Sequence, residues 1–209
     1  MIQDLFHFFG KAICHQLEER SLQASGETLS VCARDTGIYI GIFSTLIYLY
    51  LFKRGAKITI PTIKISLFLL LLLVPLMIDG LGSYLHLFKT DNTRRLLTGI
   101  SFGLALPYFI YPLLSAKALD ETSKPVITQK KDFFVPLIFS CGLGGLVYWG
   151  KLSYFVFDGF IILIIITWFS MCGSFLFSKI QNTRLKTALS VCSSLVFLST
   201  LSLLHSLIL

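Results

Sequence analysis

Six long apolar segments constrain the fold of this chain more than any other feature. They cover approximately residues 36–52, 65–88, 96–116, 133–150, 154–177 and 187–209. A run of about 20 apolar residues can cross a bilayer as one α-helix, and a helix satisfies its own backbone polar groups in lipid. The segments do not alternate apolar and polar residues as transmembrane strands do. The sequence therefore predicts an all-α fold, a polytopic membrane helix bundle of about six transmembrane helices.

Little of the chain remains outside these segments. Hydrophobic residues make up 55% of the sequence and charged residues 14%, whereas a soluble domain carries about 25% charged residues. We therefore expect a single membrane domain over residues 1–209. Residues 1–35 form a polar N-terminal region whose first turns place apolar side chains on one face, as in a helix lying at the membrane interface. They lack the basic leader and long apolar stretch of a secretory signal, so we expect no cleavage.

The Lys and Arg residues lie outside the apolar segments, in the loops and the N-terminal region. The net charge is +7, but the sequence contains no nucleic-acid-binding motif, so we expect no nucleic-acid partner. The loops after the first, third and fifth segments hold 11 of the 18 Lys and Arg residues, and the N-terminal region and remaining loops hold 7. Loops rich in Lys and Arg face the cytoplasm. This bias predicts that the N-terminal region lies on the extracytoplasmic side.

The stretch from Cys14 to Gly41 contains most of the reactive side chains that precede the spans. Cys14 and His15 are followed by Cys32 and Asp35, and zinc accepts thiolate, imidazole and carboxylate ligands. The Cys32-x-x-Asp35 pair resembles half of a zinc knuckle with one ligand exchanged. A Cys14–Cys32 disulfide is the alternative, since an oxidising outer face permits it. Two free thiols without a special role are the third possibility, and the sequence leaves all three open.

Asp79 is the most informative single residue, because an ionisable group inside a span is costly and usually functional. In a continuous helix it shares one face with Ser83 and His86, at positions i, i+4 and i+7. Asp79 is a candidate catalytic base or metal ligand. The alternative is a structural ion pair with one of the neighbouring arginines.

Several basic and polar residues on the predicted outer side are candidate anion-binding groups. Arginine holds phosphate or carboxylate through forked hydrogen bonds, so a phospholipid headgroup or a lipid-linked phosphate is the expected ligand. Ordinary contact with lipid headgroups is the alternative. The candidates are Arg20, Arg34, Asn92, Arg94 and Arg95.

Two glycine pairs predict close helix packing. Gly37 and Gly41 lie in the first span, and Gly99 and Gly103 in the third. Small residues four apart allow the backbones of two helices to approach closely. We found no nucleotide-binding, serine-hydrolase, HExxH or haem-attachment motif.

Together these motifs resemble the "domain of unknown function 2085" family of predicted prokaryotic membrane proteins. The resemblance covers about residues 14 to 103 and rests on CHQ-x3-RS, CARDTGIYIG, DG and N-x-RR-x3-G-x3-G. Many members carry C-A-R-C where this chain has Cys32-Ala33-Arg34-Asp35; a carboxylate can replace a thiolate on a metal, but it cannot form a disulfide. The resemblance implies a multi-span protein of a prokaryotic cytoplasmic membrane and no particular reaction.

The leading functional hypothesis is a zinc-dependent membrane enzyme that acts on a lipid or lipid-linked phosphate or ester at the outer face. Cys14, His15, Cys32 and Asp35 would be metal ligands, with Asp35 and Asp79 as the candidate catalytic carboxylates. Membrane lipids would be the partners. One alternative is a small transporter with Asp79 as the coupling residue. Another is a non-enzymatic assembly factor stapled by the Cys14–Cys32 disulfide.

Overall fold

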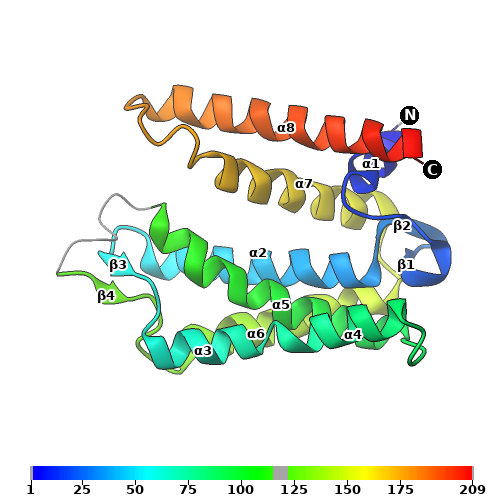
Figure 1. The fold of residues 1–209 in the computed structure, drawn as a ribbon, viewed down its shortest axis with the longest axis horizontal. Coiled ribbons are helices and arrows are strands. Elements are labelled where there is room, and N and C mark those ends of the chain that lie inside the picture. The colour runs from blue at the N-terminus through cyan, green and yellow to red at the C-terminus, as the bar shows by residue number, and fades with distance from the viewer. Residues whose placement is uncertain (1, 115–121, 209) are drawn as a thin grey trace. The chain divides into compact units, whose positions relative to one another are not determined.

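The computed structural model describes residues 2–114 and 122–208, and helices dominate it (Figure 1). The helices are α1 (Ile2–Lys11), α2 (Ala33–Lys53), α3 (Ile63–Leu71), α4 (Val74–Tyr84), α5 (Asn92–Leu113), α6 (Lys131–Trp149), α7 (Tyr154–Gly173) and α8 (Thr183–Ile208). The short elements are the 3-10 turn η1 (Glu18–Arg20) and strands β1 (Ser21–Ala24), β2 (Glu27–Cys32), β3 (Ile58–Thr59) and β4 (Lys124–Pro125). The predicted all-α bundle is confirmed.

Six helical segments are long and apolar enough to cross a membrane, which confirms the predicted number of spans. They are α2, the α3–α4 pair, α5, α6, α7 and α8. Large apolar side chains on these helices are exposed, including Leu67, Leu71 and Leu207. Exposed apolar surface on this scale suits contact with lipid rather than water. The predicted span ends at Ala116 and Leu209 lie outside the described residues.

The second span differs from the continuous helix that the sequence predicts. It is divided into α3 and α4 by a turn at Leu72 and Leu73, just before Pro75. Proline has no amide hydrogen to donate to the carbonyl four residues earlier, so the helical ladder breaks there. The helix then ends at Tyr84, and His86 adopts a positive φ of 55°. The prediction that His86 shares a helical face with Asp79 is therefore wrong.

Backbone contacts group the chain into two compact units, which we describe separately. We call Met1–Cys32 with Trp149–Leu209 the terminal unit, and Ala33–Tyr148 the central unit. The expectation of one membrane domain remains a prediction.

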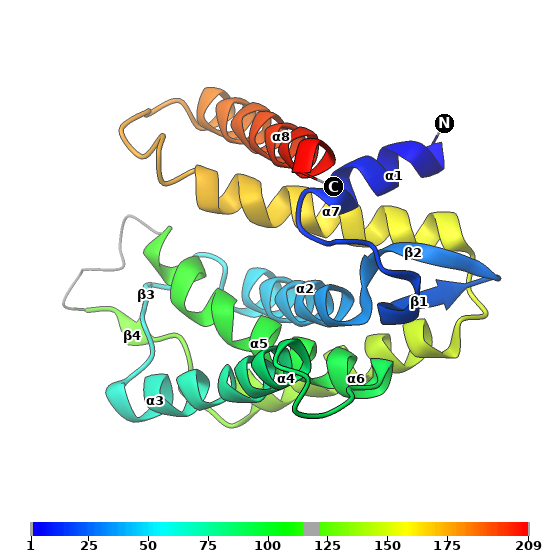
Figure 2. The same cartoon turned by 45° about the vertical axis from the view of Figure 1, so that its right-hand side comes forward.

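The terminal unit contains a β-hairpin that the sequence analysis did not predict. Strands β1 and β2 pair antiparallel around Ser25 and Gly26, whose φ values of 51° and 86° suit a tight hairpin turn. Figure 2 shows the two strands running side by side. Helix α1 approaches β2 so closely that a side chain at Gly10 would meet the Ser30 backbone.

A buried carboxylate fixes this hairpin to α7. Asp158 is fully buried, and it accepts hydrogen bonds from the Ser30 amide (3.0 Å) and the Ser30 hydroxyl (2.8 Å). Its second oxygen accepts one from the Tyr154 hydroxyl at 2.8 Å. All of these donors are neutral, so Asp158 joins β2 to α7 through hydrogen bonds rather than through an ion pair.

The central unit is built around the contact of α2 with α5, which lie side by side in both views (Figures 1 and 2). All four glycines of the predicted packing motifs lie in this contact. A side chain at Gly37 or Gly41 would meet the backbone of α5 at Leu96 or Ile100. The converse holds for the two glycines of α5, where a side chain at Gly99 or Gly103 would meet the backbone of α2.

Candidate functional site

The thiols of Cys14 and Cys32 lie together in the terminal unit. Cys14 follows the end of α1 and is buried, and Cys32 is the last residue of β2 and is half-buried. Their sulfur atoms lie within 4.8 Å of each other, and the Cys32 amide donates a hydrogen bond to Cys14 Sγ at 3.2 Å. The chain therefore brings together two cysteines that are 18 positions apart.

Gln16 holds the loop that carries Cys14 against β2. Its side-chain amide donates to the backbone oxygens of His7 (2.7 Å) and Ser30 (2.9 Å). Gln16 also adopts a positive φ of 55°, a conformation that turns the chain sharply after His15. The Cys-His-Gln motif thus combines a candidate ligand with the residue that positions its loop.

His15 points toward the C-terminal helix rather than joining the thiols. Its ring packs edge to face against the ring of His205, with centroids 4.7 Å apart. The Nδ1 atom of His205 lies 2.8 Å from the Lys11 carbonyl oxygen. The structure thus pairs His15 with a histidine of α8, a contact that could not be predicted from the sequence.

The donor set around the two thiols fits a zinc ion. Two thiolates at the usual Zn–S length of about 2.3 Å in a tetrahedral shell are about 3.8 Å apart, so the present separation requires at most a small rotation. Asp35 is the third residue of α2 and follows Cys32 after only two intervening residues. Asp35 is therefore the carboxylate nearest to Cys32 along the sequence.

Asp79 forms an ion cluster with two arginines in the central unit. Asp79 lies on α4 and is fully buried. One carboxylate oxygen accepts a hydrogen bond from Arg34 Nη2 at 2.6 Å. The other lies 3.2 Å from Arg94 Nε, close enough for an ion pair but without hydrogen-bond geometry. Of the roles predicted for Asp79, the structure shows the ion-pair role.

The cluster carries more positive than negative charge. Two guanidinium groups face the single carboxylate, and the Arg34 Nε is buried without a hydrogen-bond partner among the described residues. The Arg94 side chain is 48% exposed, and its guanidinium stacks on the Phe88 ring, 4.4 Å from the centroid. Aromatic stacking fixes the plane of the guanidinium while leaving its edge available. This edge could bind an anion.

The remaining predicted anion-binding residues lie in other surroundings. Arg95 is buried and donates to Asn92 Oδ1 at 3.3 Å on the first turn of α5. Arg20 belongs to the terminal unit, where it forms an exposed ion pair with Glu19 at 3.4 Å.

Sequence reasoning missed a second buried carboxylate in the central unit. Asp132, on the first turn of α6, is 1% exposed and accepts hydrogen bonds from Tyr48 Oη (2.7 Å) and Lys53 Nζ (3.0 Å). The amides of Thr128 and Gln129 also donate to it, each at 2.9 Å. The available signal was a tyrosine inside a span, because a buried hydroxyl needs a partner.

Comparisons with known proteins agree with the membrane fold. A family model described as "Predicted membrane protein (DUF2085)" matches residues 14–109. An uncharacterised protein of Methanothermobacter thermautotrophicus is 36% identical over 94 residues, which are 45% of this chain and 80% of that protein. The uncharacterised protein MJ1492 of Methanocaldococcus jannaschii is 32% identical over 101 residues, 48% of this chain. The match spans 63% of that protein's length, less than two thirds. No solved structure matches the chain.

Proposed function

We propose that this chain, which belongs to the DUF2085 family of predicted membrane proteins, is a zinc-dependent membrane enzyme acting on a lipid or lipid-linked phosphate or ester. The observation that carries the proposal is the pair of thiols, Cys14 and Cys32, with sulfur atoms within 4.8 Å. Asp35 would be the third ligand, since it follows Cys32 by three positions along the chain, and three protein ligands are typical of catalytic zinc sites.

Along the sequence, a candidate anion-binding residue adjoins the proposed metal ligands. Residues 32–35 contain a thiol, the guanidinium of Arg34 and the carboxylate of Asp35 within four positions. Arg34 and the half-exposed Arg94 both face Asp79, and their charge exceeds that of the carboxylate. A phosphate can accept forked hydrogen bonds from such guanidinium groups. This arrangement supports a phosphate-bearing substrate.

In the proposed reaction, the metal and the arginines have separate roles. When bound, zinc supplies a water of lowered pKa, which can attack a phosphate or ester at neutral pH. Arg94 and Arg34 orient the anionic group and stabilise the negative charge that develops on it. Asp79 is the positioning residue for both guanidinium groups, because its two oxygens face them. Asp35 serves as a metal ligand, and the Lys and Arg bias supports an outer-face location.

Zinc analysis of the purified protein tests the metal. We expect about one zinc per chain, and its loss in Cys14→Ala and Cys32→Ala. Cys141→Ala is the matched control, because Cys141 is an exposed cysteine within α6 and its removal should leave the zinc content unchanged. Wild-type protein that contains no zinc when purified without chelators would refute the metal.

The substrate is tested separately, by the release of inorganic phosphate from phosphatidic acid in mixed micelles. Arg94→Ala should reduce this release while keeping the zinc, since Arg94 contacts the anion and not the metal. Equal activity of Arg94→Ala and wild type would refute the role of the arginine cluster.

The separation of the two thiols also favours one alternative, an assembly factor with a Cys14–Cys32 disulfide. Alkylation before and after reduction separates the two cases. A disulfide makes both cysteines reactive only after reduction, whereas zinc-bound thiols react once a chelator is added.

A further inference from the structure

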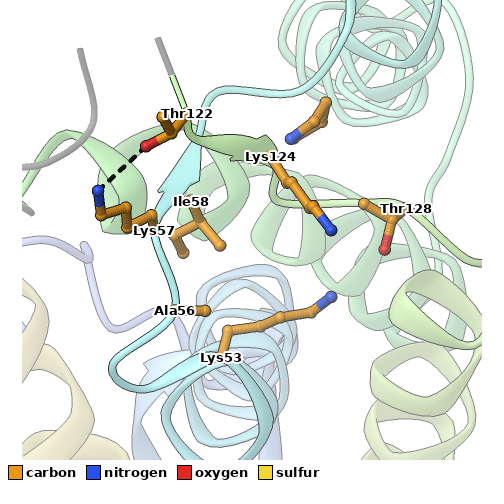
Figure 3. A pocket seen from close by; sticks show the side chains of 8 residues that line it. Lys53, Ala56, Lys57, Ile58, Thr122, Lys124 and Thr128 are labelled. Atoms are coloured by element: carbon orange, nitrogen blue, oxygen red, sulfur yellow. Dashed lines mark hydrogen bonds between the residues drawn. The ribbon is translucent and has the colours of Figure 1, made fainter. Parts of the chain in front are cut away.

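A basic pocket lies at the opposite end of α2 from Arg34. It has a volume of about 250 Å³ and lies beside the paired strands β3 and β4. Three lysines line it, namely Lys53 from the end of α2, Lys57 before β3 and Lys124 in β4 (Figure 3). The other lining residues are Ala56, Ile58, Thr122, Pro125 and Thr128.

The charges in this pocket favour an anion. Lys53 Nζ lies 3.0 Å from Asp132, whose carboxylate also accepts hydrogen bonds from Tyr48 and two backbone amides. Lys57 Nζ donates to Thr122 Oγ1 at 3.1 Å. The Lys124 ammonium forms no ion pair within the described part of the chain. In Figure 3 the ammonium groups of Lys53 and Lys124 extend to the same side of the pocket as Thr128.

An apolar groove adjoins the basic pocket. Its volume is about 330 Å³, and most of its lining consists of side chains from α3, α6 and the segment before α6. The aromatic residues are Phe68, Phe133 and Phe134, and the rings of Phe68 and Phe133 meet edge to face with centroids 5.3 Å apart. Thr128 lines both cavities. A basic cavity and an apolar cavity therefore meet at one residue.

We propose that these two cavities together bind one anionic phospholipid. Its phosphate lies between the lysines, and an acyl chain lies along the groove over Phe68 and Phe134. The charge of the pocket matches a phosphate, and the groove matches the hydrocarbon chain that only an amphiphile carries. The position of the pocket also suits a phospholipid headgroup, because Lys53 ends one span and Asp132 begins another, at the level where lipid headgroups lie. The site is separate from the proposed metal and does not depend on it.

Native mass spectrometry of the detergent-solubilised protein tests this proposal. We would titrate phosphatidylglycerol and phosphatidylcholine with identical acyl chains and expect phosphatidylglycerol to bind more tightly. A lysine near anionic headgroups contributes about fivefold in affinity, so Lys124→Ala should weaken phosphatidylglycerol binding about fivefold and leave phosphatidylcholine unchanged. Phe134→Ala should weaken the binding of both lipids. Lys53 is not a suitable test, since its removal leaves buried Asp132 without its cation.

Two controls make the result decisive. Lys179→Ala removes an exposed lysine from the loop between α7 and α8 and should leave both affinities unchanged. Glycerol 3-phosphate supplies the headgroup without acyl chains and should not displace the lipid at matched concentration. Unchanged phosphatidylglycerol binding by Lys124→Ala would overturn the proposal, as would an equal loss in Lys179→Ala. Displacement by glycerol 3-phosphate would identify the ligand as a soluble anion and would also overturn it.

Discussion

Replacing Gly41 by alanine should force α2 and α5 apart. A Cβ atom on Gly41 would lie 2.6 Å from the Ile100 carbonyl oxygen and 2.7 Å from the Leu104 amide nitrogen. Carbon and oxygen atoms in the closest favourable helix contacts are about 3.3–3.6 Å apart, so the backbones must separate by roughly 0.7–1 Å at this point. Both obstructing atoms belong to the backbone of α5, and no side chain can rotate to make room.

The change in unfolding free energy caused by Gly41→Ala is the sum of two opposing effects. Overpacking of this kind costs about 1–3 kcal/mol, while alanine gains about 0.5–1 kcal/mol over glycine inside a helix. Gly142→Ala in α6 is the matched control, because a Cβ there would meet nothing within 4 Å. This variant should therefore show only the stability that alanine gains over glycine. The difference between the two variants is therefore the overpacking cost alone.

Thermal unfolding in detergent, followed by size-exclusion chromatography, measures this difference. A loss of 1 kcal/mol lowers Tm by about 2–4 °C for a chain of this size, so Gly41→Ala should unfold roughly 2–12 °C below Gly142→Ala. Equal Tm values for the two variants would refute the close approach of α2 and α5 at Gly41.

Two further predictions concern the buried carboxylates. Arg34→Ala should lower the free energy of unfolding more than Arg94→Ala, because the Arg34 side chain is 24% exposed and that of Arg94 is 48% exposed. Denaturant titration in mixed micelles measures both losses, and the loss for Arg94, the more exposed partner, should be about 1 kcal/mol or less. A larger loss for Arg94→Ala than for Arg34→Ala would contradict the prediction. Tyr154→Phe should lower the free energy of unfolding by about 1 kcal/mol, because it removes one hydrogen-bond donor from Asp158. Asp158→Ala leaves all of these donors without an acceptor and should cost several times more in the same titration. Equal losses would show that Asp158 does not organise the hairpin.

The sequence predicts the spans and the glycine contact well, because both depend on local patterns. A run of about 20 apolar residues needs no partner to be recognised, and two glycines four apart lie on one helical face wherever the helix packs. In the sequence, the signal for the division of the second span was Pro75. The turn at Leu72 and Leu73 lies on its N-terminal side, because the missing amide affects the preceding turn.

The hairpin and Asp132 could not be predicted in the same way. Strand β1 has only four residues, too few for an alternating pattern to stand out among the polar residues around it. The buried state of Asp132 depends on Tyr48 and Lys53, which are about 80 positions away along the chain. Its sequence neighbours, two lysines and a glutamine, are typical of an exposed loop. The local amides of Thr128 and Gln129 also bind Asp132, but its tyrosine and lysine partners come from the distant end of α2.

The three buried carboxylates differ in one respect that decides which of them can take part in binding. Asp158 accepts from neutral donors, and Asp132 holds a lysine whose side chain is 16% exposed. Only the Asp79 cluster contains a half-exposed guanidinium, that of Arg94. Exchanging a partner for a ligand costs least where the charged group is already hydrated, because little further desolvation is required. Of the three carboxylates, Asp79 is therefore the one whose own ion-pair partner can turn toward an anion at the smallest desolvation cost.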